Sequence, residues 1–325
     1  MWTARNITDL NLTEPSAITI GAFDGVHLGH KALIERLVLE ARLQALQPIV
    51  ITFDPLPGQI LEEDYGLLSS LEERIARIRA LGVAGLLILR FDEELMATSA
   101  ETFVRRMVDH LALRSLWVGP DFTLGRDREG NVEYLQEAGQ RFGFTVNVLN
   151  QPIMWDGKPV RSSRIRDALK SGDIEEANGC LGYPYHVRGV VVHGEKRGRA
   201  LGFPTANLES PRGRLLPADG VYICRAHRPS GSYDAISNVG TRPTFNNYPT
   251  TIEAYLLDFS GDLYGTTLKL DFLKRLRPEL RFSSAEALIA QMRQDEAYAR
   301  TWLRARAQRA ADEGSIGQER STGKS

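Results

Sequence analysis

The amino-acid sequence predicts an α/β protein in two parts: a parallel sheet with crossover helices, followed by an antiparallel β-barrel with a C-terminal helix. Two observations predict this fold class. In the first half, short apolar runs alternate with amphipathic stretches of helical period, which is typical of βαβ units. In the second half, β-branched and alternating segments are separated by Gly, Pro and Asn, and a long helical pattern returns only near the end.

The strands expected in the first half are short and continuously apolar, as strands buried on both faces of a sheet are. They cover residues 17–21, 48–53, 85–91, 115–119 and 144–149. Helices are expected between them over residues 31–46, 70–82 and 101–113. The second of these helices has clear ends, because Ser70 can cap its first turn and Gly82 comes at its end. In such a sheet, ligands bind outside the carboxyl ends of the strands.

The pattern changes near residues 182–186, where we place a domain boundary. The strands expected beyond it cover residues 185–194, 220–227, 233–240, 250–259 and 265–273. Turn-forming stretches rich in Gly, Pro and Asn join them. A helix is expected over residues 283–308, followed by a small polar tail. The expected organisation is therefore a domain over 1–183, a domain over 184–310 and a disordered tail over 311–325.

The composition excludes several classes of partner. The 40 Lys and Arg residues nearly balance 41 Asp and Glu, so no overall field favours nucleic acid or an acidic membrane surface. The apolar runs fall short of the ~20 residues of a membrane span, and the charged start lacks the apolar core of a signal peptide. Cys180 and Cys224 form no CxxC pair and suit a reducing compartment. We therefore expect a cytoplasmic protein that binds neither nucleic acid nor membrane.

The stretch GAFDGVHLGH, residues 21–30, lies between an expected strand and an expected helix. His27 and His30 share one face of a helical turn, which suits a metal site, a phosphate site or ordinary packing. A zinc site needs further ligands, and neither cysteine is close in sequence. A strand-to-helix turn offers backbone N–H groups and the positive end of a helix dipole, and glycines let a phosphate approach. The context therefore favours a phosphate site.

Three later stretches carry polar groups that suit nucleotide chemistry. RSSRIRDAL, residues 161–169, places hydroxyl and guanidinium groups at an expected helix start, where they bind phosphate or simply cap a charged helix. In GRALGFPTANL, residues 198–208, Thr205 and Asn207 put two neutral oxygens on one face of an extended chain. These oxygens suit a magnesium ion shared with phosphates, or local turn caps. Glu253 lies in an apolar strand, where a carboxylate must face water, a cation or a substrate.

These stretches carry a family resemblance. GAFDGVHLGH resembles the HxGH signature of the nucleotidyltransferase superfamily in its FAD synthetase form. VGPDFTLGRDREGN, residues 118–131, resembles the segment built on DFxFG, and RSSRIR resembles SSTRIR. GFPTAN resembles the riboflavin kinase motif around PTAN, and residues 238–245, 258–265 and 272–282 support the same half. Residues 17–300 are thus similar to the bifunctional riboflavin kinase/FAD synthetase family of prokaryotes.

The resemblance implies two activities on one chain. A Rossmann-like nucleotidyltransferase domain would transfer AMP from ATP to FMN, giving FAD and pyrophosphate. An antiparallel barrel with a C-terminal helix would transfer the γ-phosphate of ATP to riboflavin, giving FMN. The implied partners are riboflavin, FMN, FAD and ATP, with Mg²⁺ as the cofactor. We expect a monomer or a weak homo-oligomer.

The resemblance also implies which residues form the sites. The implied catalytic groups are Glu253, as base toward the ribityl 5′-hydroxyl, and the histidines His27 and His30. The implied nucleotide-binding residues are Gly21, Phe23, Asp24, Gly29, Ser162, Ser163, Arg164, Arg166, Gly198, Gly202, Thr205 and Asn207. Of these, Thr205 and Asn207 would also hold the metal. The implied flavin-binding residues are Asp121, Phe122 and Arg242.

One stretch departs from the family pattern. In TFDPLP, residues 52–57, Leu56 stands where the family usually has a histidine. Three alternatives therefore stay open at this point. Only the kinase half is active, or the first half transfers a nucleotidyl group to a different phosphate, or the chain is a flavin-binding or regulatory protein without activity.

Overall fold

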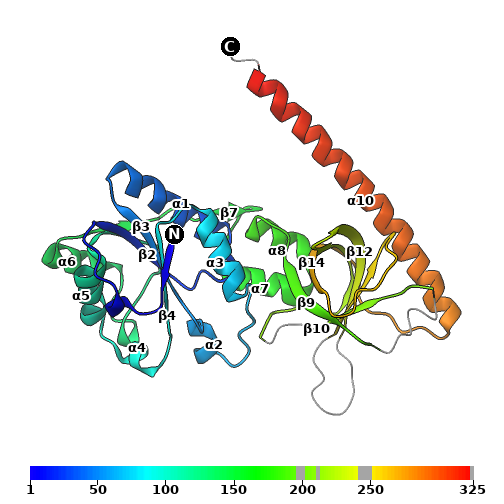
Figure 1. The fold of residues 1–325 in the computed structure, drawn as a ribbon, viewed down its shortest axis with the longest axis horizontal. Helices are drawn as coiled ribbons and strands as arrows, with labels where there is room; N and C mark the ends of the chain where they lie inside the picture. The colour runs from blue at the N-terminus through cyan, green and yellow to red at the C-terminus, as the bar shows by residue number, and fades with distance from the viewer. Residues whose placement is uncertain (195–201, 210–212, 241–250, 323–325) are drawn as a thin grey trace. The chain divides into compact units, whose positions relative to one another are not determined.

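The computed structural model describes residues 1–194, 202–209, 213–240 and 251–322 (Figure 1). The chain forms two compact units, and each is described here by itself. The first unit comprises Met1–Asp167 together with Gly179–Gly182 and Gly213–Leu215. The second comprises Ala168–Asn178, Tyr183–Arg212 and Leu216–Ser325. Two of the residues implied by the family resemblance, Gly198 and Arg242, lie outside the described residues.

The first unit is built on a six-stranded parallel sheet of order β1-β4-β3-β2-β5-β6. The strands are β1 (Trp2–Ala4), β2 (Ser16–Ile20), β3 (Gln47–Phe53), β4 (Gly85–Leu89), β5 (Leu113–Val118) and β6 (Thr145–Val148). Its helices are α1 (Leu28–Leu43), α2 (Pro57–Leu61), α3 (Leu71–Ala80), α4 (Glu93–Ala97), α5 (Ala100–Leu111) and α6 (Val132–Phe142). The predicted parallel sheet is confirmed.

Helices cover both faces of this sheet. Ile49 and Ile51 of β3 pack in one buried cluster with side chains of α5 and α6, whereas Val50 packs in a second cluster with α1 and α3. Successive strand residues point to opposite faces, so burial on both faces explains why the strands are continuously apolar. The connections outside the carboxyl ends of β2 and β3 contain the 3₁₀ turn η2 (Asp24–Val26) and α2.

The remaining elements of this part of the chain are short. The 3₁₀ turns η1 (Ile7–Asp9) and η3 (Arg126–Arg128) and the hairpin of β7 (Met154–Trp155) and β8 (Lys158–Pro159) precede α7 (Ser162–Ser171) and α8 (Ile174–Leu181). A later segment also belongs to the first unit. Leu67 donates its N–H to the Gly213 carbonyl at 2.8 Å and accepts from the Leu215 N–H at 3.0 Å. Between them, Arg214 Nη1 lies 2.9 Å from Glu73 Oε2 in a mostly buried ion pair.

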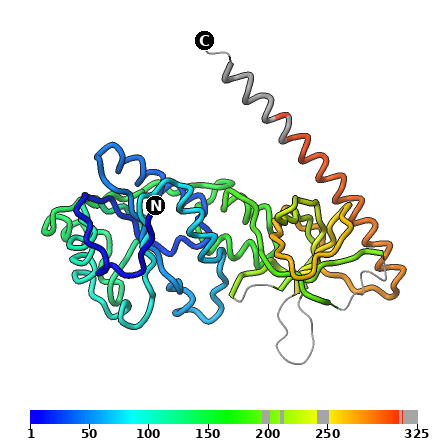
Figure 2. Tube along the Cα trace, in the orientation of Figure 1, coloured from blue at the N-terminus to red at the C-terminus, as the bar shows by residue number. Residues whose placement is uncertain are grey.

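The second unit is a closed antiparallel barrel of order β10-β13-β12-β11-β14-β9. Its elements are β9 (His186–Val192), β10 (Ala206–Glu209), β11 (Gly220–Arg228), β12 (Gly231–Gly240), β13 (Thr251–Leu256), β14 (Thr267–Arg277) and α10 (Ala285–Thr322). The closed ring can be followed in Figure 2. The predicted barrel followed by a C-terminal helix is confirmed, and the helix continues past residue 308, the predicted end, to Thr322.

The two faces of the barrel strands are used differently. In β13, Ile252, Ala254 and Leu256 are buried, whereas the alternate residues are only half-buried. Since a closed barrel of this size is filled by its inward side chains, the buried set lines the interior. Helix α10 packs on the outer face, where Ala299 and Leu303 join the cluster around Ile223. The half-buried residues of β13 therefore lie on the outer face of the barrel, the face that α10 partly covers.

Candidate active sites

A row of polar residues crosses the outer face of the barrel. Strand pairing places Asn207 of β10 opposite Glu253 of β13, and Glu253 opposite Asn238 of β12. Directly opposed residues of antiparallel strands share a face, so the three side chains lie next to one another. Thr205 precedes Asn207 by two residues, and its Oγ1 lies 3.5 Å from Glu253 Oε2. The structure thus brings Thr205, Asn207 and Glu253, three of the residues implied for the second half, into one cluster.

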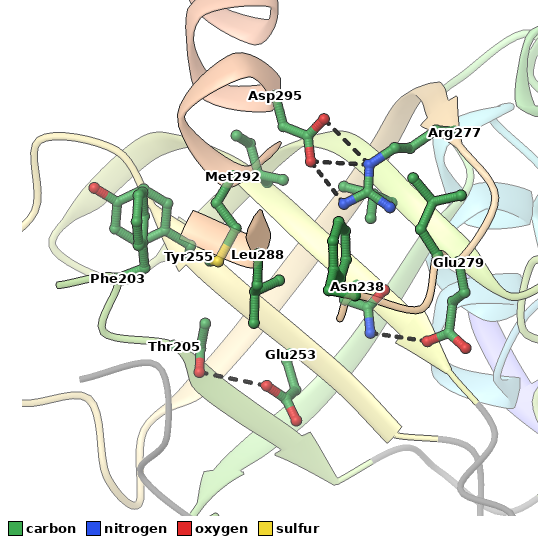
Figure 3. Close-up of a pocket in the computed structure, with 14 residues that line it drawn as sticks. Phe203, Thr205, Asn238, Glu253, Tyr255, Arg277, Glu279, Leu288, Met292 and Asp295 are labelled. Atoms are coloured by element: carbon green, nitrogen blue, oxygen red, sulfur yellow. Dashed lines mark hydrogen bonds and ion pairs between the residues drawn. The ribbon is translucent and has the colours of Figure 1, made fainter. Parts of the chain in front are cut away.

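A cavity of about 400 Å³ lies beside this row (Figure 3). Its walls are largely apolar: Phe203 and Tyr255 pack edge to face at 5.4 Å, and α10 contributes Leu288 and Met292. The carboxylate of Glu253 faces the same space. An apolar pocket with few convergent polar groups is typical of a small-molecule site. The size and lining suit a flat aromatic ligand whose reacting group reaches Glu253.

Two polar pairs at this cavity were not predicted from the sequence. Arg277 Nη2 lies 2.8 Å from Asp295 Oδ2 and its Nε 3.0 Å from the same oxygen, so β14 is joined to α10. Asn238 donates to Glu279 Oε1 at 3.1 Å. Residues 238–245 and 272–282 resembled the family, but no sequence pattern pairs positions in different elements.

The histidine stretch forms a tight turn ahead of α1. Phe23, Gly25 and Val26 have φ values of 49°, 75° and 41°, in the left-handed region that a β-branched residue rarely adopts. His27 caps α1 by accepting the His30 N–H on its Nδ1 at 3.3 Å. Because Nδ1 is an acceptor there, the neutral ring carries its proton on Nε2. A Cβ at position 29 would lie 3.2 Å from the His27 ring, so Gly29 leaves room for it.

The two imidazoles are stacked and neutral. Their ring centroids lie 3.6 Å apart at an interplanar angle of 17°, and Phe23 packs edge-on against His30 at 5.1 Å. Burial lowers the pKa of His27 to about 4 and the pKa of His30 well below its usual value, and the Arg166 charge acts in the same direction. Within the described residues, the buried His30 Nδ1 has no hydrogen-bond partner. A neutral pair with an unsatisfied ring nitrogen suits hydrogen bonding to a phosphate.

Asp24 and Arg166, 142 residues apart, are brought together at this turn. Arg166 Nη2 lies 2.6 Å from Asp24 Oδ2, and the Asp24 side chain is 1% exposed. Gly21 ends the preceding strand, where a Cβ would lie 3.0 Å from the Phe23 ring. The implied residues of the stretch 21–30 therefore lie together at the turn between β2 and α1, and Arg166 lies beside them.

The serines and Arg164 lie at the start of α7. Ser162 is the first residue of this helix, Ser163 is exposed, and Arg164 donates to the carbonyls of Trp155, Lys158 and Pro159. In this structure Arg164 therefore holds the β7–β8 hairpin.

The other implied residues are more scattered. Asp121 is exposed and lies 3.6 Å from Arg161, next to Ser162. Phe122 packs against the cluster that includes α5 and α6. Gly202 is exposed with φ 85°. Leu56, the departure from the family pattern, is fully buried at the start of α2.

Across the described ranges, no group of three or more His, Cys, Asp and Glu side chains could hold a metal ion. In that same part of the chain, no helix is both long enough and apolar enough to cross a membrane.

The chain is similar to known proteins over nearly its whole length. Residues 10–164 match the FAD synthetase family model and residues 181–303 match the riboflavin kinase family model. A bifunctional riboflavin kinase/FMN adenylyltransferase of Pseudomonas fluorescens is 40% identical over 285 residues, which is 87% of this chain and 91% of the relative. The protein of that name from Escherichia coli (strain K12) is 37% identical over 297 residues, 89% of this chain and 93% of the relative.

A solved structure shares the fold of most of the chain. The crystal structure described as a macrolide-efflux protein from Streptococcus pneumoniae superimposes with a TM-score of 0.84 at 31% identity, covering 92% of this chain and 98% of that one.

Proposed function

As the chain belongs to the family of bifunctional riboflavin kinase/FMN adenylyltransferases, we propose that residues 1–183 form its adenylyltransferase domain and residues 184–310 its kinase domain. The chain phosphorylates riboflavin to FMN and adenylylates FMN to FAD, using ATP in both steps. The match of the two family models to residues 10–164 and 181–303 supports this division.

In the kinase step, Glu253 acts as general base. The apolar cavity takes the isoalloxazine ring, so that the ribityl chain reaches the polar row. The 5′-hydroxyl oxygen then attacks the γ-phosphorus of ATP, its proton passes to Glu253, and the bond from the γ-phosphorus to the leaving ADP oxygen breaks. Such base help is typically worth about 10²–10⁴-fold in rate. The single observation that carries this assignment is that Glu253 lines the cavity with its Oε2 3.5 Å from Thr205 Oγ1, directly opposite Asn207 in the paired strand.

The donor set fits magnesium. Thr205 and Asn207 supply neutral oxygens, which suit a cation that phosphates chiefly hold. Bound there, Mg²⁺ would neutralise charge on the ATP phosphates. We assign Mg²⁺ to the kinase step on this ground, and to the adenylyltransferase step because that step also uses ATP.

In the adenylyltransferase step, the phosphate of FMN attacks the α-phosphorus of ATP and pyrophosphate leaves. The attacking oxygen is already anionic, so this step needs no general base. Histidines with lowered pKa values are poor bases but good neutral donors, which supports a role for His27 Nε2–H and His30 in stabilising charge at the α-phosphate. The backbone of Gly21, Phe23 and Gly29 approaches the nucleotide at the same turn.

Other groups complete this site. The start of α7, with Ser162, Ser163 and Arg164, supplies donors to the triphosphate, and Asp24 and Arg166 border it. Gly202 shapes the nucleotide loop of the kinase site, for which Gly198 is also assigned. The residues assigned to the flavin are Asp121, Phe122 and Arg242.

The proposal extends to the oligomeric state of the chain and to its cellular compartment. We assign a monomer or weak homo-oligomer in the cytoplasm. Cys180 and Cys224 support the location, because both are buried thiols outside any disulfide and suit a reducing compartment.

One experiment separates the two sites. Purified protein is incubated with riboflavin and Mg-ATP, or with FMN and Mg-ATP, and the flavins are resolved chromatographically. Glu253→Gln should abolish FMN formation and leave conversion of FMN to FAD intact, whereas His30→Ala should let FMN accumulate. Glu279→Gln is the matched control, because its carboxylate lies at the same cavity and is bonded to Asn238. Parallel loss of both activities in Glu253→Gln, or an equal loss in Glu279→Gln, would contradict the assignment.

A further inference from the structure

Asp24 is buried and its carboxylate is occupied by groups of the protein. Oδ1 accepts from the Leu68 N–H at 3.1 Å, the Ser69 N–H at 3.0 Å and the Ser69 hydroxyl at 3.2 Å. Oδ2 accepts from Arg166 at 2.6 Å and lies 3.5 Å from the Tyr65 hydroxyl. A carboxylate offers about four lone-pair sites. Donors from two segments, residues 65–69 and Arg166, therefore account for the acceptor capacity of Asp24.

Arg166 is held from three directions. Its Nε donates to the Gly66 carbonyl at 2.9 Å, its Nη2 pairs with Asp24, and its guanidinium lies 4.1 Å above the Tyr65 ring. Only 14% of the side chain is exposed. The cation is thus fixed in place before any nucleotide binds.

The same carboxylate supports the strained turn that leads to the histidines. Ser69 donates to Asp24 through its hydroxyl and accepts the Gly25 N–H on the same oxygen at 2.9 Å. Positive φ values at Phe23 and Val26 persist only where surrounding contacts hold the backbone. Asp24 and Ser69 supply those contacts from both sides of the turn.

We propose that Asp24 and Ser69 are positioning residues for adenylyl transfer: Asp24 holds Arg166 and the His27–His30 turn in one fixed arrangement and does not bind the nucleotide. This inference rests on the adenylyltransferase site proposed above. A carboxylate aimed at the triphosphate would repel it, whereas one turned into the protein fixes a cation near it. Asp24 was predicted from the family resemblance as a nucleotide-binding residue, and the proposal replaces that role.

The kinetic constants of FAD formation distinguish the two roles. Asp24→Asn keeps the shape but removes the charge: one oxygen still accepts, whereas the other is replaced by an NH₂ group that cannot accept from Arg166 or from a backbone N–H. If Asp24 positions the site, kcat for FMN to FAD should fall about 10²-fold, as small displacements of reacting groups cost, while KM for ATP stays within about threefold. A direct ligand would instead give a rise of about tenfold or more in KM with kcat retained, and that result would overturn the proposal.

Ser69→Ala provides the second variant, because this side chain contacts Asp24 and Gly25 and was not assigned to the nucleotide. It should lower kcat by a smaller factor without raising KM for ATP. In the double variant the loss should be less than the product of the two single losses, because both act on one cluster. Independent, multiplying losses would contradict the shared role.

Controls are built into the chain. Riboflavin phosphorylation by each variant should stay within about twofold of the parent, and hydrogen exchange of β2 and α1 peptides should match the parent, which shows that both units are folded. Loss of either would indicate a folding defect and overturn a role confined to positioning. Asp109→Asn, at an exposed carboxylate of α5, should change neither activity. His30→Ala reports separately on the proposed site: if it leaves FAD formation intact, the site assignment fails whatever Asp24→Asn shows.

Discussion

Lowering the pH should destabilise the first unit through His27. The pKa of this buried histidine is about 4 in the folded protein, against 6.5 for an ordinary histidine. Below pH 6.5 the unfolded chain therefore binds a proton that the folded chain does not, so stability is lost as the pH falls from 6.5 toward 4. Between pH 6.5 and pH 5 the loss is one and a half pH units at ~1.36 kcal/mol per unit, about 2 kcal/mol.

The comparison with His27→Gln isolates the effect of the stacked His27–His30 pair, because the titrating groups outside this pair are shared by the two proteins and cancel. The protein is equilibrated in urea at pH 7 or pH 5, and the unfolded fraction is then measured by a brief hydrogen-exchange pulse at one fixed pH. Exchange is read on peptides of β2 and α1, so that the measurement reports on the first unit alone. The parent should lose about 2 kcal/mol more than His27→Gln between the two pH values. Parallel losses in the two proteins would refute the account of a buried neutral imidazole.

Three further changes test other features. Gly194→Ala puts a Cβ 2.2 Å from the Asn207 amide, which must move, so riboflavin phosphorylation should fall about tenfold or more while conversion of FMN to FAD is unchanged in a chromatographic assay. Asp295→Ala leaves the mostly buried Arg277 without its ion-pair partner and should destabilise the barrel by about 3–5 kcal/mol in thermal unfolding; a loss under about 1 kcal/mol would contradict this. Leu56→His buries an imidazole at a fully enclosed position and should cost about 1–3 kcal/mol of stability, and faster FAD formation with no such cost would contradict it.

Much of the fold could be predicted because the buried strands are recognisable as short, continuously apolar runs. The residues of β3, such as Val50 and Ile51, are apolar on both faces, and both faces are buried. Strand β1 was missed because three residues are too few to carry a period. The C-terminal helix was predicted to end near residue 308, where the sequence turns small and polar, yet α10 runs to Thr322. The change to small and polar residues therefore did not mark the end of this helix.

Site residues that lie close together in the sequence could be predicted from a short motif. Site residues that only strand pairing brings together could not. Thr205 and Asn207 are two residues apart, so one stretch reveals both. Their neighbours Asn238 and Glu279 come from distant parts of the sequence and meet only because β12 pairs with β13 and β14 leads back over the cavity. The ion pair of Asp24 with Arg166 also joins distant parts of the sequence. From the sequence, each residue was expected to bind the nucleotide, and the pairing could not be predicted.

The segment Gly213–Leu215 has a consequence for dividing the gene. Leu67 takes both of its backbone partners from this segment. The segment comes after β6, the last strand of the sheet, and after β9, the first strand of the barrel, so it is encoded with the barrel. A fragment ending at residue 183 would carry the sheet but leave two amide groups of Leu67 and the Glu73 carboxylate without these partners. A single cut cannot release the first unit intact, so exchanging the adenylyltransferase between chimeras requires transplanting two separate stretches of sequence.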